Sequence, residues 1–267
     1  MKFKGLNENQ VKDLLPDNLI LLGYRGSVVH GTYIKNKDPH GIDDKDIMGV
    51  YVHSLSHYFG FSKRTTKERF INEWDAVHYE LSKYVNLLLK SNPNVMSLLW
   101  IPENYIIYKD EYGKLLRDNK DLFVSKKAYH SFSGYAHGQL KRMTNFACQG
   151  YMGEKRKILV EKYGYDTKNA AHLIRLLRMG IEFLNEGKLY VQRSDAQELI
   201  RIKKGEYSLD TIKRMADNLF EQALIAYQES TLPNEPDYLA AQNLVQRIIL
   251  DYFQLKQDRK VKFGREI

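Results

Sequence analysis

Apolar residues in the first hundred positions form short continuous runs, which are typical of buried strands. Two such runs, Asn18 to Tyr24 and Ile47 to Val52, predict strands. Phe70 to Tyr79 also has strand character. Leu81 to Lys90 has the spacing of an amphipathic helix, which the turn Asn92-Pro93-Asn94 ends. This part of the chain therefore alternates strands and helices.

The connections between these elements are polar. Residues 35–43 read as a loop, and residues 53–67 read as an irregular connection. Gly26-Ser27 predicts a turn that leads into a short helix, and Val95 to Trp100 is a further apolar segment. Residues 103–124 give no clear pattern, so the end of this first unit is set only approximately.

From Ser125 onward, apolar residues recur every three or four positions, which predicts helices. The expected helices are Ser125 to Ala147, Lys155 to Lys162, Asp166 to Glu186, Asp195 to Lys203, Leu209 to Gln228 and Asp237 to Leu255. The predicted class is α+β. It consists of a small N-terminal unit at residues 1–110, with a mixed sheet and flanking helices, and a helical unit at residues 111–267.

Net charge and composition limit the classes of binding partner to be expected. The 267 residues include 41 Lys and Arg against 33 Asp and Glu, a net charge of +8. This charge favours an anionic partner such as a nucleotide or nucleic acid, but a generally basic surface explains it equally well. The 19 tyrosines and 11 phenylalanines include rings that could stack on bases, although most are expected in the core or at its rim.

The cysteine count and the hydropathy point to the cytoplasm. The single cysteine, Cys148, excludes an intramolecular disulfide and a zinc site built on two thiolates. Met1 to Glu8 contains no apolar signal region, and the apolar stretch Leu19 to Tyr24 is too short to span a bilayer. We expect a cytoplasmic protein without membrane contact, and the sequence leaves its oligomeric state open.

The segment from Gly23 to Val52 carries the candidate chemistry. A Gly26-Ser27 turn after a strand presents backbone N–H groups and a hydroxyl, which suit the oxygens of a triphosphate. Asp44 and Asp46 are two apart, so on a strand both carboxylates point to one face. Paired carboxylates repel each other unless cations lie between them, and their hard oxygens suit Mg²⁺.

A third carboxylate from a neighbouring strand would complete a site for two metal ions. Asp75 is the best placed candidate, and Glu80 is the rival with the opposite strand parity. Either the Asp-x-Asp pair or the Gly-Ser turn alone is a weak signal, but their order and spacing together are more specific. The chain contains neither a P-loop motif nor a G-x-G-x-x-G motif in this segment.

These motifs resemble those of the DNA polymerase β-type nucleotidyltransferase superfamily, which has a Gly-Ser motif, an Asp-x-Asp strand and a third strand carboxylate. The chain is similar, more narrowly, to the RNA-repair-associated nucleotidyltransferases of bacteria and phages. The further segments that carry this resemblance are Lys83 to Asn94, Gly164 to Arg175, Arg193-Ser194-Asp195 and Leu199 to Gly205. The resemblance covers about residues 20 to 206, and it implies a palm-like mixed sheet followed by helices.

The resemblance also implies an activity. NMP would pass from an NTP to an acceptor hydroxyl, most simply an RNA or tRNA end, and pyrophosphate would be released. Asp44, Asp46 and Asp75 would be the catalytic residues and would hold two Mg²⁺ ions, with Mn²⁺ as an alternative. The loop from Ser27 to Asp44 is longer than in many members, and Asp43 replaces a usual serine, which would add negative charge beside the metals.

Cations from the helical unit are expected to bind the nucleotide together with Arg25, Gly26 and Ser27. Four residues at spacings of three and four share much of one helix face: Lys168, His172, Arg175 and Arg178. A solvated basic face is the competing interpretation. His130 and His137 are expected to pack or to lie on the surface. Two other functions stay open, a nucleotidyltransferase that modifies a protein or small molecule and a non-catalytic nucleic-acid-binding protein.

Overall fold

The strands form one mixed sheet. The computed structural model describes residues 18–60, 66–71, 74–144 and 153–254. The strand order in the sheet is β3-β4-β2-β1-β5. The strands are β1 (Leu19–Arg25), β2 (Lys45–Tyr51), β3 (Thr66–Ile71), β4 (Trp74–Glu80) and β5 (Ile106–Lys109). β2 and β4 are parallel and the other neighbours are antiparallel, which confirms the predicted mixed sheet.

Helices flank the sheet and fill the rest of the described chain. The α-helices are α2 (Ser27–His30), α3 (Leu55–Phe59), α4 (Leu81–Leu88), α5 (Pro93–Trp100), α6 (Glu111–Asp118), α7 (Ala128–Thr144), α8 (Glu154–Tyr163), α9 (Thr167–Glu186), α10 (Ala196–Lys203), α11 (Leu209–Glu229) and α12 (Tyr238–Tyr252). Two 3₁₀ turns, η1 (Glu103–Tyr105) and η2 (Lys120–Phe123), precede β5 and α7. None of the helices in the described ranges combines the length and apolar character needed to cross a bilayer.

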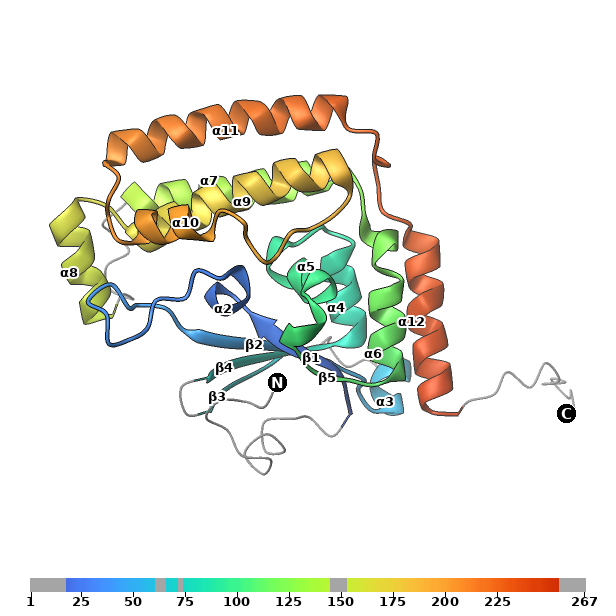
Figure 1. Ribbon diagram of the computed structural model, residues 1–267. Coiled ribbons are helices and arrows are strands. Elements are labelled where there is room, and N and C mark those ends of the chain that lie inside the picture. Colours follow the sequence, from blue (N-terminus) through green and yellow to red (C-terminus); the bar gives the residue numbers. More distant parts are fainter. Residues whose placement is uncertain (1–17, 61–65, 72–73, 145–152, 255–267) are drawn as a thin grey trace, which may run out of the picture.

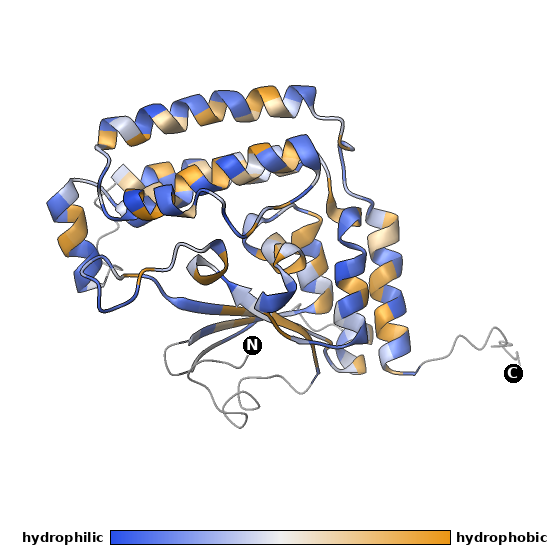
Figure 2. Ribbon diagram, in the orientation of Figure 1, coloured by the Kyte–Doolittle hydropathy of each residue, from blue (hydrophilic) through white to orange (hydrophobic). Residues whose placement is uncertain are grey.

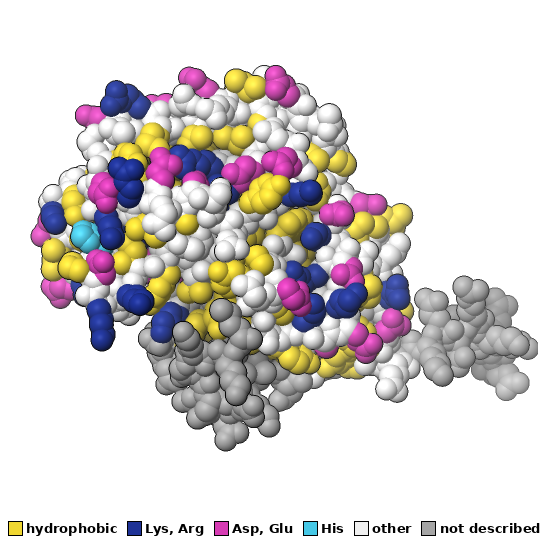
Figure 3. Space-filling view, in the orientation of Figure 1, with side chains coloured by type: hydrophobic (Ala, Val, Ile, Leu, Met, Phe, Trp, Pro, Cys, Tyr) yellow, Lys and Arg dark blue, Asp and Glu magenta, His cyan; other side chains and the backbone are white. Residues whose placement is uncertain are grey.

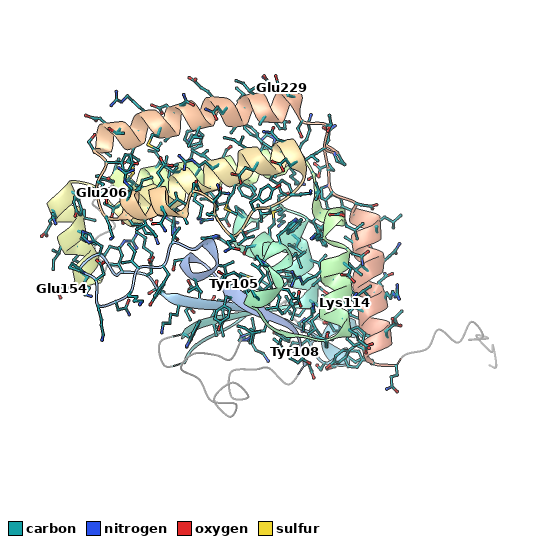
Figure 4. All side chains as sticks on the ribbon, in the orientation of Figure 1. Tyr105, Tyr108, Lys114, Glu154, Glu206 and Glu229 are labelled. Atoms are coloured by element: carbon teal, nitrogen blue, oxygen red, sulfur yellow. The ribbon has the colours of Figure 1, made fainter. Side chains whose placement is uncertain are left out.

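Most of the helices are stacked in layers on one side of the sheet (Figure 1). α7, α9 and α10 lie above the sheet, with α2, α4 and α5 between, and α11 lies over α7 and α9. α6 and α12 run along one end, where α12 contacts α4 and α6. Figure 4 marks Tyr108 on β5 at the lower boundary and Glu229 at the end of α11 at the upper boundary.

Apolar residues connect the layers into one core. They occupy the strands and the inward sides of the helices, and polar residues cover the outward sides (Figure 2). Ile20, Leu21 and Leu22 of β1 are fully buried, as are Leu173 and Ile174 of α9. On the face drawn in Figure 3, Lys and Arg side chains alternate with Asp and Glu. The net positive charge is therefore not gathered on that face.

Helix starts follow the capping residues in the sequence. The side chain of Asp166 accepts hydrogen bonds from the backbone N–H groups of Lys168 and Asn169, so α9 begins where the sequence predicts. Asn92 caps α5 in the same way, with Pro93 in the first turn. The described parts of all six predicted C-terminal helices are confirmed, with ends that differ by a few residues.

Three segments differ from the sequence prediction. The polar stretch 53–67 contains the short helix α3 and the start of β3. The strand expected at Phe70 to Tyr79 is divided between β3 and β4, which pair antiparallel with Ile71 opposite Trp74. β5 and α6 lie in the unassigned stretch 103–124, where β5 is too short for a period to show. Cys148 and the predicted helix end at Ala147 lie outside the described residues.

Candidate active site

Two aspartates lie side by side on adjacent strands, near the residues where β2 and β4 begin. Asp46 of β2 is paired in parallel register with Asp75 of β4, so their side chains leave the same face of the sheet. Asp46 is also paired with Arg25 of β1 on its other side. The sequence prediction that Asp75 comes to the Asp-x-Asp segment from a neighbouring strand agrees with this register. The result is a row of Arg25, Asp46 and Asp75 across three strands.

The Gly26-Ser27 turn closes against this row. Gly26 has a φ of 67°, in the region that favours glycine, and a Cβ at this position would collide with Oδ2 of Asp46. Glycine is therefore needed both for the turn and for the approach of the carboxylate. Ser27 begins α2, and its buried Oγ has no hydrogen-bond partner among the described residues. Both features suit a ligand that brings acceptor oxygens to the turn.

Asp44 stands directly before β2 and joins the helical layer. Its Oδ2 is 3.2 Å from Nζ of Lys168 on α9, and its side chain is 72% exposed. Nζ of Lys168 also donates to the carbonyl oxygen of Ile42 at 2.9 Å. In the described part of the chain, no three His, Cys, Asp or Glu side chains are grouped closely enough to hold a metal ion. The Asp44 carboxylate is paired with Lys168 and does not form a close cluster with the carboxylates of Asp46 and Asp75.

The charges nevertheless act on one another. Burial raises the pKa of Asp46 above its ordinary value, and Asp44 and Asp75 raise it further, while Arg25 opposes them. A half-buried carboxylate beside two others is the electrostatic situation that a divalent cation relieves, and carboxylate oxygens are the donors that Mg²⁺ prefers. The donor chemistry of the three aspartates therefore fits such an ion.

Glu80 and Asp43 take structural roles that differ from those considered in the sequence. Glu80 is at the opposite end of β4 from Asp75, fully buried, and caps α4 by accepting from the N–H groups of Ser82 and Lys83. It is therefore placed away from the aspartate row. Asp43 is also buried and is paired with Nζ of Lys203 at 2.8 Å. The extra negative charge expected from Asp43 is thus neutralised within the protein.

Helix α9 brings cations to the opposite wall. Lys168, His172 and Arg175 line the same cavity as Arg25, Ser27 and the aspartates. Burial lowers the pKa of Arg175 to about 10, and the neighbouring Arg193 contributes, but the guanidinium stays charged at pH 7. Burial, with Arg175 and Lys203 nearby, lowers the pKa of His172 well below its usual value, so this imidazole is neutral at pH 7.

Arg178 is turned away from this wall. It lies ten residues after Lys168; at 3.6 residues per turn, it is rotated by about 80° from that residue. Its Nη1 is 2.6 Å from Asp195 and 2.7 Å from Glu198, so its charge is already balanced. The structure does not bring Arg178 together with the other nucleotide-binding candidates, although the spacing of three and four suggested a shared face.

The cavity has a volume of about 870 Å³, within the range of small-molecule sites. A third wall comes from α7 and the start of α5, which sequence reasoning did not assign to a site. These residues are Pro93, Asn94, Ser97, His130, Ser131, Gly134, Tyr135, Gly138, Gln139 and Arg142. His130 was expected only to pack or to lie on the surface. The sequence signal was the polar and glycine-rich face of α7, opposite its apolar face.

Comparison with known proteins identifies the family of this chain. A family model described as "RNA repair pathway DNA polymerase beta family" matches residues 7–247. No curated protein matches the chain. A solved structure titled as a nucleotidyltransferase-like protein from Exiguobacterium sibiricum 255-15 matches at 10% identity and a TM-score of 0.26, over 92% of this chain and 78% of that one. The family match spans most of the sequence, and the chain therefore belongs to the RNA repair pathway DNA polymerase beta family, a family of nucleotidyltransferases.

Proposed function

We propose that this nucleotidyltransferase transfers NMP from an NTP to a hydroxyl at an RNA or tRNA end and releases pyrophosphate. The observation that carries this proposal is the pairing of Asp46 with Asp75 beside the Gly26-Ser27 turn, in one cavity with the cations of α9. Carboxylates on one wall and cations on the other suit the two needs of phosphoryl transfer, metal ligation and polyphosphate binding.

The triphosphate would lie between the Gly-Ser turn and α9. Ser27 offers a hydroxyl without another described partner, and Arg25 and Arg175 offer guanidinium groups. Lys168 would exchange its contact with Asp44 for a phosphate oxygen. This exchange would free the Asp44 carboxylate to turn toward Asp46, so nucleotide binding and completion of the acidic cluster would be coupled.

Asp44, Asp46 and Asp75 are the residues that would hold Mg²⁺, two ions in the complete site, or Mn²⁺ in its place. When bound, the metal would lower the pKa of the acceptor hydroxyl and neutralise charge on the leaving pyrophosphate. By holding the metal, the three aspartates would place it where the acceptor oxygen and the α-phosphate meet, and Arg25 limits the repulsion at Asp46. The acceptor hydroxyl loses its proton to solvent as its oxygen bonds to the α-phosphorus, and the bond between the α-phosphorus and the bridging oxygen breaks to release pyrophosphate.

An RNA acceptor is supported by two observations. The family to which the chain belongs is described by its place in RNA repair, and the net charge of +8 favours a polyanionic partner. A protein or small-molecule acceptor is the competing case, because the aspartates and cations alone do not distinguish acceptors.

The test uses the purified protein with Mg²⁺ and each α-labelled NTP. Total RNA, tRNA, a protein extract and small hydroxyl compounds are offered separately as acceptors. We expect label on RNA or tRNA, and its loss in an Asp46→Asn variant that still binds RNA. Label found only on protein or a small compound would refute the RNA acceptor, and transfer that survives in Asp46→Asn would refute the assignment of the aspartates.

A further inference from the structure

Helix α7 presents two contrasting faces. Phe132, Ala136 and Met143 are buried and point to the layer of α9, which α7 contacts along its length. The other face lines the cavity. We call this second set the α7 face: His130, Ser131, Gly134, Tyr135, Gly138, Gln139 and Arg142. It runs from 130 to 142 at steps of three and four, and it faces the cavity of the aspartates and the cations. Gln139 lies at its border with the buried side, because it follows Phe132 by seven residues and is rotated from it by only about 20°.

Two glycines keep this wall open. Each glycine in a helix interior costs about 1 kcal/mol relative to alanine. A Cβ built at Gly134 or at Gly138 meets no atom of another described segment within 4 Å. Close packing inside the described protein therefore does not require glycine at either position. What the two glycines provide is space between the α7 backbone and the cavity.

Gln139 supplies an independent indication of a ligand. Its surface is only 9% exposed, and it lines the cavity next to Gly138. Its buried Oε1 accepts no hydrogen bond from any described residue. A buried acceptor without a partner costs about 1–3 kcal/mol, which a ligand carrying an N–H donor would recover. Tyr135 lies one turn before it, and its hydroxyl accepts a hydrogen bond from Nδ2 of Asn92 at 2.9 Å, which holds the ring in place.

These observations describe a binding site on the α7 face, called the seat below, for a flat group with an N–H donor. The open strip over the glycines suits a planar ring. The fixed Tyr135 is a ring on which it could stack, and Gln139 could accept a hydrogen bond from its edge. A nucleobase has all of these features. The seat and the proposed triphosphate site belong to the same cavity of about 870 Å³, which is large enough for a whole nucleotide.

We propose that the α7 face binds a nucleobase, that of the incoming NTP, with Gln139 Oε1 accepting a hydrogen bond from the base. This inference rests on the proposed function for the triphosphate end of the cavity and adds the residue that reads the base. A nucleobase of the acceptor end has the same chemistry, and the experiment separates the two sources.

The experiment measures binding to the whole protein in the presence of Mg²⁺. The probes are ATP, CTP, GTP, UTP, inorganic tripolyphosphate and a short RNA with a free 3′ hydroxyl. The variants are Gln139→Leu, which removes the acceptor, and Gly138→Leu, which fills the open strip. Gln228→Leu on the exposed side of α11 is the matched control. Thermal unfolding of each variant checks that it is folded.

We expect Gln139→Leu and Gly138→Leu each to lower the affinity for at least one NTP by about tenfold, which is the loss typical of one buried hydrogen bond. The affinity for tripolyphosphate should stay unchanged. Weaker RNA binding with unchanged NTP binding would keep the seat and assign it to the acceptor base. Unchanged affinity of folded Gly138→Leu for every nucleotide and RNA would overturn the proposal. NMP transfer with an unchanged KM for every NTP and for RNA in both variants would overturn it while the proposed function stands, whereas base-dependent binding without any transfer would do the reverse.

Discussion

Lys203, the last residue of α10, forms a buried ion pair with Asp43, which directly precedes the aspartates of the candidate site. Nζ of Lys203 lies 2.8 Å from Oδ1 and 2.9 Å from Oδ2 of Asp43. It also donates to the carbonyl oxygen of Thr32 at 2.8 Å, and Asp43 accepts from the N–H of Ile34. The pair therefore fixes the loop before β2 to the helical layer, and it fixes the backbone position from which Asp44 follows.

Removing one partner of this pair should destabilise the protein strongly. Lys203→Met leaves the Asp43 carboxylate buried without its cation, and we expect a loss of about 3–5 kcal/mol in the free energy of unfolding. The double variant Asp43→Asn/Lys203→Met leaves no buried charge and should be more stable than Lys203→Met alone. Urea unfolding curves of the set measure this. Equal stability of Lys203→Met and wild type would show that the pair does not form.

The catalytic assignment predicts unequal effects for aspartates of the cavity and of the surface. Asp46→Asn and Asp75→Asn should each lower the rate of NMP transfer by at least about 100-fold, equivalent to about 3 kcal/mol of transition-state stabilisation. Asp118→Asn, at the exposed ion pair with Lys114, is the control and should transfer normally. Initial rates with labelled NTP test this, and a normal rate in Asp75→Asn would remove it from the reaction.

The raised pKa of Asp46 leads to a separate prediction for the metal-free protein. Burial and then the charges of Asp44 and Asp75 raise this pKa, so ionised Asp46 opposes folding. This destabilisation of the folded state is absent below the pKa of Asp46 in the unfolded chain and complete above its pKa in the folded protein. At pH 7 without metal, Asp46→Asn should therefore unfold at a higher denaturant concentration than wild type.

Addition of Mg²⁺ should reverse this order. An ion that binds only the folded state stabilises it by mass action, so wild type should gain melting temperature with Mg²⁺ and Asp46→Asn should gain much less. Thermal unfolding with Mg²⁺ or with a chelator provides the measurement. Equal gains in both proteins would place the ion elsewhere.

The contrast between Arg175 and Arg178 is a test of the cation wall. Nη1 of Arg175 has only the weak acceptor Sδ of Met179, at 3.2 Å, as its described hydrogen-bond partner, whereas Arg178 is paired with Asp195 and Glu198. Arg175→Leu should raise the KM for NTP by about tenfold or more through the loss of a charge-assisted contact. Arg178→Leu should leave the KM unchanged and lower the melting temperature. The opposite pattern in steady-state kinetics would restore Arg178 as the nucleotide contact.

The sequence predicted what depends on local periodicity and on motifs. The helices after residue 125 and the strands β1 and β2 follow from apolar spacing, and the row of Asp46 and Asp75 follows from placing both on neighbouring strands. The polar and glycine-rich pattern of α7 distinguishes its sides but does not say what each side faces, so the role of the α7 face in the cavity was not predicted. The roles of Asp43 and Arg178 depend on partners far away in sequence, Lys203 and Asp195.

The buried His30 predicts how stability depends on pH. Burial, and then the positive charge of Arg175, lowers the pKa of His30 well below its ordinary value, so the ring is neutral in the folded protein. It lies 2.8 Å from the carbonyl oxygen of Val191, to which Nδ1–H donates. The unfolded chain binds a proton that the folded protein does not bind. Stability from this group is therefore complete above the unfolded pKa and is lost as the pH falls below it, by about 1.4 kcal/mol per pH unit until the folded pKa is reached.

A His30→Gln variant separates this effect from the loss of a hydrogen bond. The amide side chain of glutamine does not titrate, so the variant should lose less stability than wild type between pH 7 and pH 5.5, even if the substitution lowers its stability at pH 7. Urea unfolding at several pH values gives the two slopes. The surface variant Gln228→Leu, which removes no titratable group, should keep the wild-type slope. If the His30→Gln slope equals that of wild type, His30 is protonated in the folded protein and the neutral, buried ring is refuted.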